Sequence, residues 1–370
     1  MFFTLIFIIA MCFMNFYSYK FFVSKIAFLK NHIFSVRIFF ILVCILEVLF
    51  IAQLRFVFFN SSFYIFSATF LAFSWFLFAI SILYHLGSTI LNKQKFSSSR
   101  REFIKICFDI TFVILFVSFF LKGLFSAIMP PKIKEKNIKI KNLKKDIKIA
   151  LITDIHIGTF LQKEFLTGIV NDINKTKPDI VAISGDLVDM KADEIGDFLD
   201  PLKDIKSKYG VFYVPGNHEY YHGVDSILAK IETLRVNVLR NDCIELDNIN
   251  VCGVYDVSGY RFDYLKPDLK QALSGVNDDK PVVLLSHQPK FVEYMDKDVD
   301  LVLSGHTHAG QIFPFGLLVL LQQPYLYGLY QHNDKMQIYV SSGAGFWGPP
   351  VRILAQSEIA ILNLYGDNNA

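Results

Sequence analysis

The sequence predicts a membrane region of about four helices followed by an α/β domain, and two observations carry this prediction. Hydrophobic residues make up 53% of the 370 residues, which is high for a soluble protein. They crowd the first 130 positions almost without carboxylates, whereas strand, helix and turn signals alternate from position 147 onward. We therefore expect a transmembrane region at 1–130, a basic linker with an edge strand at 131–146 and a globular domain at 147–370.

Four apolar stretches account for the membrane region. They cover Phe2–Tyr17, Ile38–Phe59, Phe63–Leu86 and Ile104–Met129. A helix needs about 20 apolar residues to cross a bilayer core, and the last three stretches reach that length. The first is shorter, but it lacks the basic start and the small-residue cleavage site of a signal peptide, so we count it as a span.

Lysine and arginine in the short loops indicate how these spans are oriented. The loops after the first and third stretches are basic, whereas the loop between the second and third has Arg55 alone. Because basic residues concentrate in cytoplasmic loops, the globular domain is expected outside the cell membrane, with both termini on that side. Several lysines between Lys132 and Lys145 favour the opposite side.

Two carboxylates, Glu47 and Asp109, lie inside the spans, where charge is costly to bury. Two carboxylates over four spans are too few to favour an ion or proton pathway. We expect Glu47 to be protonated or paired with Arg55 and to face a neighbouring helix. A transporter with a fused domain is disfavoured, because the spans have few polar residues and few Gly or Pro breaks.

Cys243 and Cys252 flank a segment that reads as a hairpin turning at Asp247-Asn248. In that register the two cysteines face each other across the strands, where side chains approach closely. A disulfide formed in an oxidising compartment and a pair of reduced cysteines both remain open.

The remaining elements alternate in the manner of an α/β fold whose sheets are covered by helices. An edge strand is expected at Asn137–Leu143, where isoleucine alternates with lysine; the lysines form a solvated face or attract anionic lipid headgroups. Helices are expected near Lys163–Asn174, Ala192–Lys206 and Val224–Leu234. Strands are expected at Ile147–Thr153, Ile180–Ser184, Val211–Val214, Val282–Leu285, Leu301–Leu303, Met336–Val340 and Ile359–Leu364.

Polar residues recur directly after these apolar strands. They are Asp154, His156, Asp186, Asn217, His218, His287, His306 and His308. Loops at the carboxyl ends of strands are where α/β folds place ligands. Imidazole and carboxylate donors suit Mn, Fe or Zn better than Ca or Mg. Two such metals about 3.5–4 Å apart can clamp a phosphoryl group and ionise a shared water, and the residue set supplies the ligands for them.

Five blocks that contain these residues resemble, in order and spacing, the signatures of the calcineurin-like metallophosphoesterases. They are Asp154-Ile-His156, Gly185-Asp186-Leu-Val-Asp189, Gly216-Asn217-His218-Glu219, Ser286-His287 and Gly305-His306-Thr-His308. The resemblance extends over roughly Ile147–Leu364. It implies a two-sheet α/β metallophosphoesterase sandwich with a dinuclear centre at the strand ends.

The same resemblance implies a role for each residue. The first metal would be held by Asp154, His156 and His308, the second by Asn217, His287 and His306, and Asp186 would bridge them. His218 is similar to the family's non-ligand histidine, which donates to the phosphoryl or leaving-group oxygen, and Asp189 would fix its tautomer. A carboxylate partner also raises the pKa of a histidine and keeps it a donor. The implied reaction is in-line attack on phosphorus by metal-bound hydroxide.

Departures from the family pattern narrow the substrate. Met190 follows Asp189, where the protein Ser/Thr phosphatases of this superfamily have an arginine that grips phosphate, so a phosphoprotein is disfavoured. The tail 343–352, together with Gly310-Gln311, resembles the membrane-associated bacterial branch of YkuE and YaeI. Phe346 and Trp347 in this tail either line a substrate mouth or pack a turn.

The leading hypothesis is a membrane-anchored hydrolase with two divalent metal ions, Mn, Fe or Zn. Its substrate would be a phosphodiester, pyrophosphate or phosphomonoester in a lipid or envelope precursor, and no nucleic acid partner is expected. The alternative is a membrane sensor or scaffold in which the metal site is structural. His218 and Asp189 speak against it, because a structural site does not need them.

Overall fold

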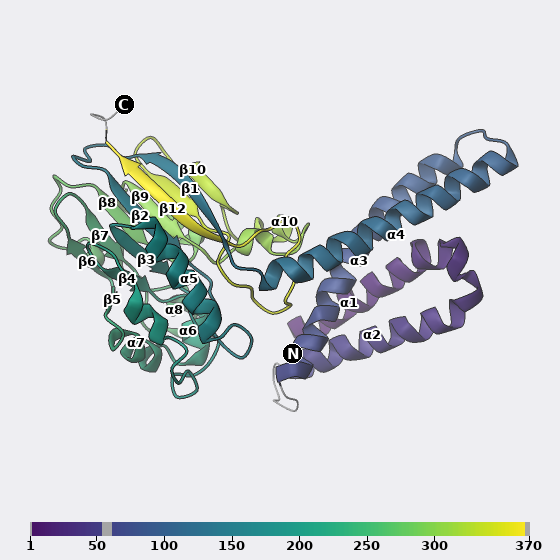
Figure 1. Cartoon of the computed structure of the whole chain (residues 1–370), viewed down its shortest axis with the longest axis horizontal. Helices are drawn as coiled ribbons and strands as arrows, with labels where there is room; N and C mark the ends of the chain where they lie inside the picture. The colour runs from purple at the N-terminus through teal and green to yellow at the C-terminus, as the bar shows by residue number, and fades with distance from the viewer. Residues whose placement is uncertain (1, 54–60, 367–370) are drawn as a thin grey trace. The chain divides into compact units, whose positions relative to one another are not determined.

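The computed structural model describes residues 2–53 and 61–366, and the chain divides into two compact units (Figure 1). The membrane unit comprises Met1–Ile128 and two short segments from the C-terminal part of the sequence, Ile312–Pro314 and Gly348–Leu354. The second unit comprises the rest of the chain. Arg55 and the end of the second predicted span lie outside the described residues.

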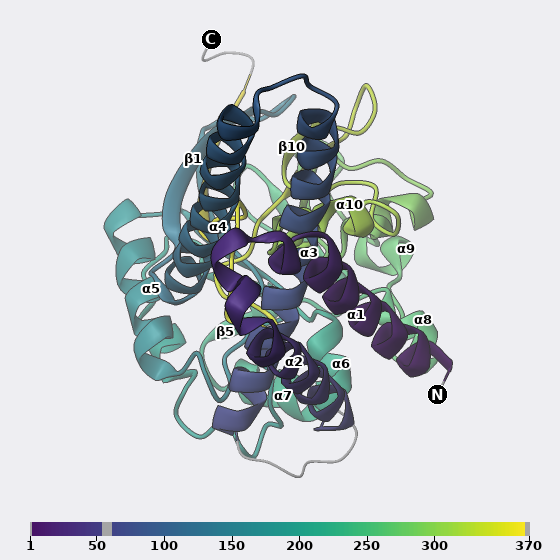
Figure 2. The same cartoon turned by 90° about the vertical axis from the view of Figure 1, so that its right-hand side faces the viewer.

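Four helices of the membrane unit are long and apolar enough to cross a bilayer, as the sequence predicts. They are α1 (Phe2–Phe21), α2 (Ile33–Gln53), α3 (Ser61–Asn92) and α4 (Ser98–Ile128), with short 3-10 turns at Val23–Lys25 and Ala27–His32. Helices α3 and α4 form a long pair (Figures 1 and 2), and Tyr84 packs on Phe108 across it. Large side chains such as Phe34 and Phe103 point outward, as expected for helices surrounded by lipid.

The two C-terminal segments of the membrane unit are packed among its helices. Ile312, Val351 and Ile353 are buried in an aromatic-rich cluster with side chains of the helices. The backbone amide of Arg352 donates to the carbonyl oxygen of Gly123 in α4 at 2.9 Å. These contacts join parts of the sequence that are more than 200 positions apart.

The two carboxylates within the spans are buried and have partners on neighbouring helices. Glu47 of α2 accepts a hydrogen bond from Asn15 of α1 at 2.8 Å. Asp109 of α4 accepts one from Tyr84 of α3 at 2.7 Å and pairs with Lys105 on its own helix. Glu47 therefore faces a neighbouring helix, as expected.

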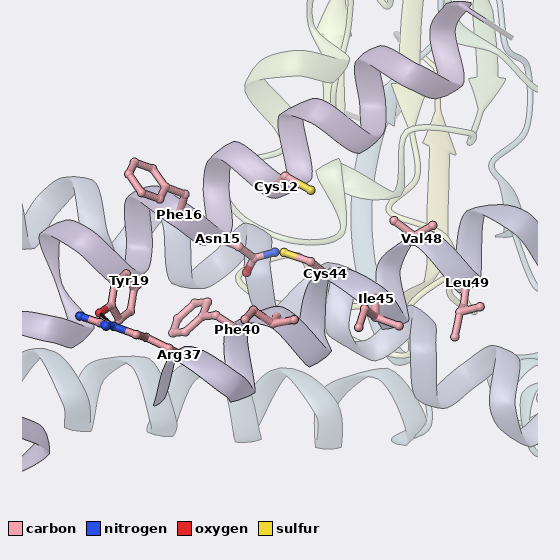
Figure 3. Close-up of a pocket in the computed structure, with 11 residues that line it drawn as sticks. Cys12, Asn15, Phe16, Tyr19, Arg37, Phe40, Cys44, Ile45, Val48 and Leu49 are labelled. Atoms are coloured by element: carbon pink, nitrogen blue, oxygen red, sulfur yellow. Dashed lines mark hydrogen bonds between the residues drawn. The ribbon is translucent and has the colours of Figure 1, made fainter. Parts of the chain in front are cut away.

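A cavity of about 560 Å³ lies between α1 and α2 (Figure 3). Asn15 and Cys44 approach each other across its middle. Arg37 and Tyr19 close one end, where Arg37 Nε donates to the Tyr19 hydroxyl at 2.7 Å. Apart from Cys12, the remaining walls are aliphatic and aromatic.

The second unit is a sandwich of two six-stranded sheets, ordered β1-β12-β2-β3-β4-β5 and β10-β11-β9-β8-β7-β6. Neighbouring strands are parallel, except that β12 with β2, β10 with β11 and β6 with β7 are antiparallel. The strands are β1 (Lys132–Lys139), β2 (Ile147–Ile152), β3 (Ile180–Ser184), β4 (Val211–Val214), β5 (Val236–Val238), β6 (Asp242–Glu245), β7 (Asn250–Gly253), β8 (Val282–Leu285), β9 (Leu301–Ser304), β10 (Gly328–Gln331), β11 (Gln337–Val340) and β12 (Glu358–Tyr365). The predicted α/β class is confirmed.

The core of this unit lies between the two sheets and fixes the positions of the strand ends. Leu151 and Phe212 from one sheet meet Val251 and Leu303 from the other in a single buried cluster. Helices pack on the outer faces; α5 buries an apolar stripe that includes Ile169. The helices are α5 (Lys163–Thr176), α6 (Asn217–His222), α7 (Val224–Glu232), α8 (Ser258–Phe262), α9 (Leu269–Ala272) and α10 (Gly316–Val319), with 3-10 turns at Asp200–Asp204, Pro289–Tyr294 and His308–Gly310.

One predicted helix is wrong. The segment Ala192–Lys206 forms turns and the short 3-10 helix Asp200–Asp204 instead of an α-helix. Gly196 has φ +56°, a left-handed conformation that ends a helix. Pro201 then removes a backbone donor that a continuing helix needs.

The predicted hairpin has the expected register. Cys243 pairs with Cys252 and Ile244 with Val251, and the amide of Leu246 donates to the carbonyl of Ile249. The sulfur atoms of Cys243 and Cys252 are bonded as a disulfide, with the Cα atoms 3.9 Å apart. The structure thus contains the disulfide, which is one of the two alternatives that the sequence left open.

Candidate metal centre

The polar residues predicted from the sequence all lie at the carboxyl ends of strands in the second unit. Asp154 and His156 follow β2, Asp186 follows β3, Asn217 and His218 begin α6 after β4, His287 follows β8, and His306 and His308 follow β9. Strands β2, β3 and β4 are parallel neighbours in one sheet, and β8 and β9 are parallel neighbours in the other. Their loops therefore meet at one end of the sandwich.

Asp154, His156 and His308 form one cluster, in which the potential ligand atoms lie within 4.8 Å of one another. Nε2 of His156 lies 3.1 Å from Nε2 of His308, which in turn lies 3.4 Å from Oδ1 of Asp154. All three side chains are buried. Each residue has φ between 49° and 53°, so its backbone turns sharply just after the strand and aims the side chain at the common point.

Asp186, His287 and His306 form a second cluster of the same kind. Oδ2 of Asp186 lies 3.2 Å from Nε2 of His287, and Oδ1 of Asn217 lies 3.2 Å from the same nitrogen. The same Asp186 oxygen is 3.9 Å from Nε2 of His156 in the first cluster. One carboxylate oxygen thus faces both clusters, which is the placement that a bridging ligand needs.

His218 stands beside these clusters and is held by Asp189. Nδ1 of His218 lies 2.6 Å from Oδ1 of Asp189, and Nδ1 of His156 lies 2.8 Å from the same oxygen. Burial lowers the pKa of His218, but Asp186 and Asp189 raise it more, to about 9. Burial raises the pKa of Asp189, but His156 and His218 lower it more, to below its ordinary range. An ionised Asp189 therefore holds both imidazoles by Nδ1 and leaves both Nε2 atoms facing the centre.

Comparison with known proteins agrees with this geometry. Residues 147–310 match the family model of the calcineurin-like phosphoesterases. A Helicobacter pylori protein named an uncharacterized metallophosphoesterase is 47% identical over 80% of this chain and 81% of its own length. The chain belongs to the calcineurin-like phosphoesterases.

Two further relatives of this phosphoesterase bear on its membrane region and on its bacterial branch. A zebrafish protein named a transmembrane protein with metallophosphoesterase domain is 33% identical over 64% of this chain and 58% of its own length. The metallophosphoesterase YkuE of Bacillus subtilis is 28% identical over 60% of this chain and 80% of its own length. The resemblance to the YkuE branch is confirmed, and the apolar helices and the transmembrane relative support membrane localisation.

The donors of this phosphoesterase fit divalent cations. Nδ1 of His287 must donate to the Ser184 carbonyl oxygen, 2.8 Å away, so in the neutral imidazole the Nε2 lone pair points at the Asp186 carboxylate. Nδ1 of His156 likewise donates to Asp189, so in the neutral imidazole the Nε2 lone pair points at Nε2 of His308. A lone pair that faces a carboxylate is repelled unless positive charge lies between them. Burial lowers the pKa of His287, but Asp186 raises it more, to well above its ordinary value, which reflects the same demand for positive charge.

Glu219 was not assigned a role from the sequence, yet it fixes the backbone of two blocks. The carboxylate accepts hydrogen bonds from the amides of Gly216 at 2.6 Å, Leu187 at 2.8 Å, Asp186 at 3.1 Å and Val188 at 3.2 Å. Glu219 is fully buried. The one available signal was a glutamate three residues after a helix cap, the second half of a capping box.

Two glycines allow the backbone to lie directly against carboxylates of the centre. A Cβ at Gly216 would lie 2.2 Å from Oδ1 of Asp186, and a Cβ at Gly305 would lie 2.2 Å from Oδ2 of Asp154. No side chain fits at such distances. The glycine that opens each of these two blocks is therefore required by packing around a carboxylate.

The aromatic residues near the centre divide into buried and exposed ones. Phe346 is buried and packs edge-on against Phe160, with ring centroids 5.5 Å apart. Trp347 is 51% exposed, and its ring centroid lies 6.0 Å from that of His218. Tyr221, also half exposed, flanks His218 at 5.4 Å. The two alternatives for the Phe-Trp pair thus separate: Phe346 packs a turn, and Trp347 stands beside His218.

Proposed function

We propose that this chain is a membrane-anchored, dinuclear-metal phosphoesterase that hydrolyses a phosphodiester, pyrophosphate or phosphomonoester of a lipid or envelope precursor. The observation that carries the proposal is the position of Asp186, whose Oδ2 atom faces both clusters, with His218 held next to it. The family supports a metal-dependent hydrolase of phosphate esters.

In this proposal the two clusters are the two metal sites. The first metal would be held by Asp154, His156 and His308, the second by Asn217, His287 and His306, and Asp186 would be the ligand shared by both. Two divalent ions, Mn, Fe or Zn, would supply Lewis-acid stabilisation of the phosphoryl oxygens and lower the pKa of a water that serves as the nucleophile.

The protein's own contribution is positioning and proton donation. Nδ1 of His218 donates its N–H to Asp189, so the second proton of the imidazolium form lies on Nε2, the nitrogen on the side of Asp186. The carboxylate of Asp189 favours this protonated form of His218, as a donor to the leaving-group oxygen requires. Burial of the clusters removes competing water and strengthens each of these interactions.

We also propose that the catalytic domain lies outside the cytoplasm. The basic loops between the spans favour this side, and the disulfide between Cys243 and Cys252 supports it because such bonds persist in oxidising compartments. A reporter fused after Ala370 tests the placement. Activity of a cytoplasm-only reporter would contradict it.

The function is tested by hydrolysis of bis-p-nitrophenyl phosphate and p-nitrophenyl phosphate by the full chain in detergent, with Mn, Fe or Zn added in turn. Asp186→Asn should abolish metal-dependent turnover, because it weakens the ligand shared by both sites. Asp197→Asn is the matched control, since Asp197 is exposed and pairs with Lys163 on the surface. Unchanged turnover in Asp186→Asn would refute the proposal. Absence of turnover in a chain that binds two metals would favour a sensor or scaffold.

A further inference from the structure

An exposed apolar loop follows the sequence block Gly305-His306-Thr-His308. Between Asp300 and Asp334 the sequence has no aspartate, glutamate, lysine or arginine. Within this stretch the segment 315–321, which contains α10, exposes five large apolar side chains: Phe315 42%, Leu317 67%, Leu318 45%, Leu320 45% and Leu321 79%. An apolar patch of this kind on a folded surface marks a site of interaction with a partner or a membrane.

The loop is held firmly at both ends. On one side Gly310 lies so close to Gly316 that a Cβ on Gly310 would be 2.4 Å from the Gly316 Cα atom. On the other side Gln323 is buried; its Nε2 donates to Oε1 of Gln288 at 3.0 Å, and its Oε1 accepts from the amide of Lys290 at 2.9 Å. Exposure of the leucines is therefore imposed by the fold around them.

One end of the loop is continuous with the membrane unit, and the other contacts the first strand of the second unit. Ile312, three residues before Phe315, is buried in the core of the membrane unit. After the loop, the hydroxyl of Tyr327 accepts from Lys134 Nζ at 2.8 Å, and Lys134 lies six residues beyond Ile128, where α4 ends. The loop is thus continuous in sequence with a segment that is packed among the spans, and its far end contacts the strand that follows the last span.

The length and composition of the loop define the partner. Seven residues cannot cross a bilayer core, which needs about 20. An uncharged, leucine-rich segment of this size is suited to the boundary between headgroups and acyl chains. A protein partner would ordinarily be matched by polar or charged groups around the apolar centre, and this stretch offers no charged side chain for such a rim.

We propose that the segment 315–321 is a lipid-contacting loop that inserts into the interfacial region of the bilayer. The loop begins seven residues after His308, so its contact with lipid places the block Gly305-His306-Thr-His308 close to the membrane surface. The contact itself does not depend on the activity proposed above.

Spin labels on the full chain in phospholipid vesicles test the proposal. Cys12, Cys44 and Cys107 are replaced by alanine, and a nitroxide is attached at Leu321→Cys. Collision of the label with oxygen, which concentrates in lipid, is compared with collision with a water-soluble nickel chelate. We expect oxygen to dominate at Leu321→Cys.

The control is Tyr294→Cys, a half-exposed position at the end of the 3-10 turn Pro289–Tyr294, where the nickel chelate should dominate. Leu317→Cys repeats the measurement if the first variant fails to fold. Dominance of the nickel chelate at the loop positions would refute lipid contact. Protection from both reagents would also refute it and would indicate that a second copy of the chain covers the loop.

Discussion

Replacement of Glu219 by glutamine tests whether its carboxylate holds the two loops around Asp186. Glutamine keeps the size of the side chain but replaces one acceptor oxygen with an NH₂ group. Each carboxylate oxygen accepts from two backbone amides, Gly216 and Asp186 on one and Leu187 and Val188 on the other. Whichever way the amide turns, its NH₂ group faces two N–H donors, and those two hydrogen bonds are lost.

The expected magnitude follows from the two bonds lost. Hydrogen bonds to charged groups contribute about 1.5–3 kcal/mol each, so Glu219→Gln should reduce the free energy of unfolding by about 3–6 kcal/mol. For a domain of this size about 1 kcal/mol corresponds to about 2–4 °C, so the melting temperature should fall by on the order of 10 °C. Metal affinity should fall with it, because Asp186 and Asn217 lose their common support.

The assay is the thermal transition of the full chain in detergent with a chelator present, so that metal binding does not contribute. The matched control is Glu232→Gln, which removes a half-exposed ion pair with Arg240 at 2.8 Å. Such surface pairs contribute about 0–1 kcal/mol. If Glu219→Gln melts no lower than Glu232→Gln, the carboxylate does not hold these loops and our reasoning about them is wrong.

Three further outcomes are expected. His218→Ala should lower kcat/KM for alkyl phosphate esters by about 10²–10⁴-fold and for nitrophenyl esters much less. The reason is that an alkoxide leaving group needs a proton, whereas nitrophenolate does not. Equal losses for both esters would contradict proton donation. Cys243→Ala should lower the free energy of unfolding in urea by about 2–3 kcal/mol, since the disulfide closes a loop with a sequence separation of 9. A wild-type chain under reducing conditions should match that variant. Chelation should lower the wild-type melting temperature and affect Asp186→Asn less, because ions that bind only the folded chain stabilise it.

Much of the fold follows from local sequence patterns. The strands β3, β4 and β8 begin and end where their apolar runs do, because buried parallel strands leave no room for polar residues. The segment 192–206 failed because its apolar spacing resembles a helix, while Gly196 and Pro201 break the backbone. The spacing of hydrophobic residues carries no information about the backbone conformation of a single glycine, so it could not predict this break.

The candidate site was predictable to the extent that it depends on residues placed at strand ends. Asp154, Asp186 and His287 could be named because the chain turns directly after each strand. The second bond of Asp189, to His156, joins two blocks 33 positions apart and has no local signature. The same holds for Glu219, whose partners lie mostly in another block.

The exposed apolar loop shows a different limit. A run of leucines such as the one in segment 315–321 is typical of a buried core. Only the exposed fractions of Leu317 and Leu321 identify it as surface. Composition reports that a segment is apolar, whereas the surrounding fold decides whether protein or lipid covers it.

The left-handed backbone at Asp154, His156, Asp186, His306 and His308 has a consequence for how this chain can change. A residue with a side chain is less stable in that conformation than glycine by about 1–2 kcal/mol. Glycine at any of these positions would therefore relax the backbone of the metal-free chain while removing a potential ligand. The hydrogen bonds that Asp154 accepts from the amide of His306 and Asp186 accepts from the amide of His218 offset part of this cost, so the backbone strain at the centre falls mainly on its histidines.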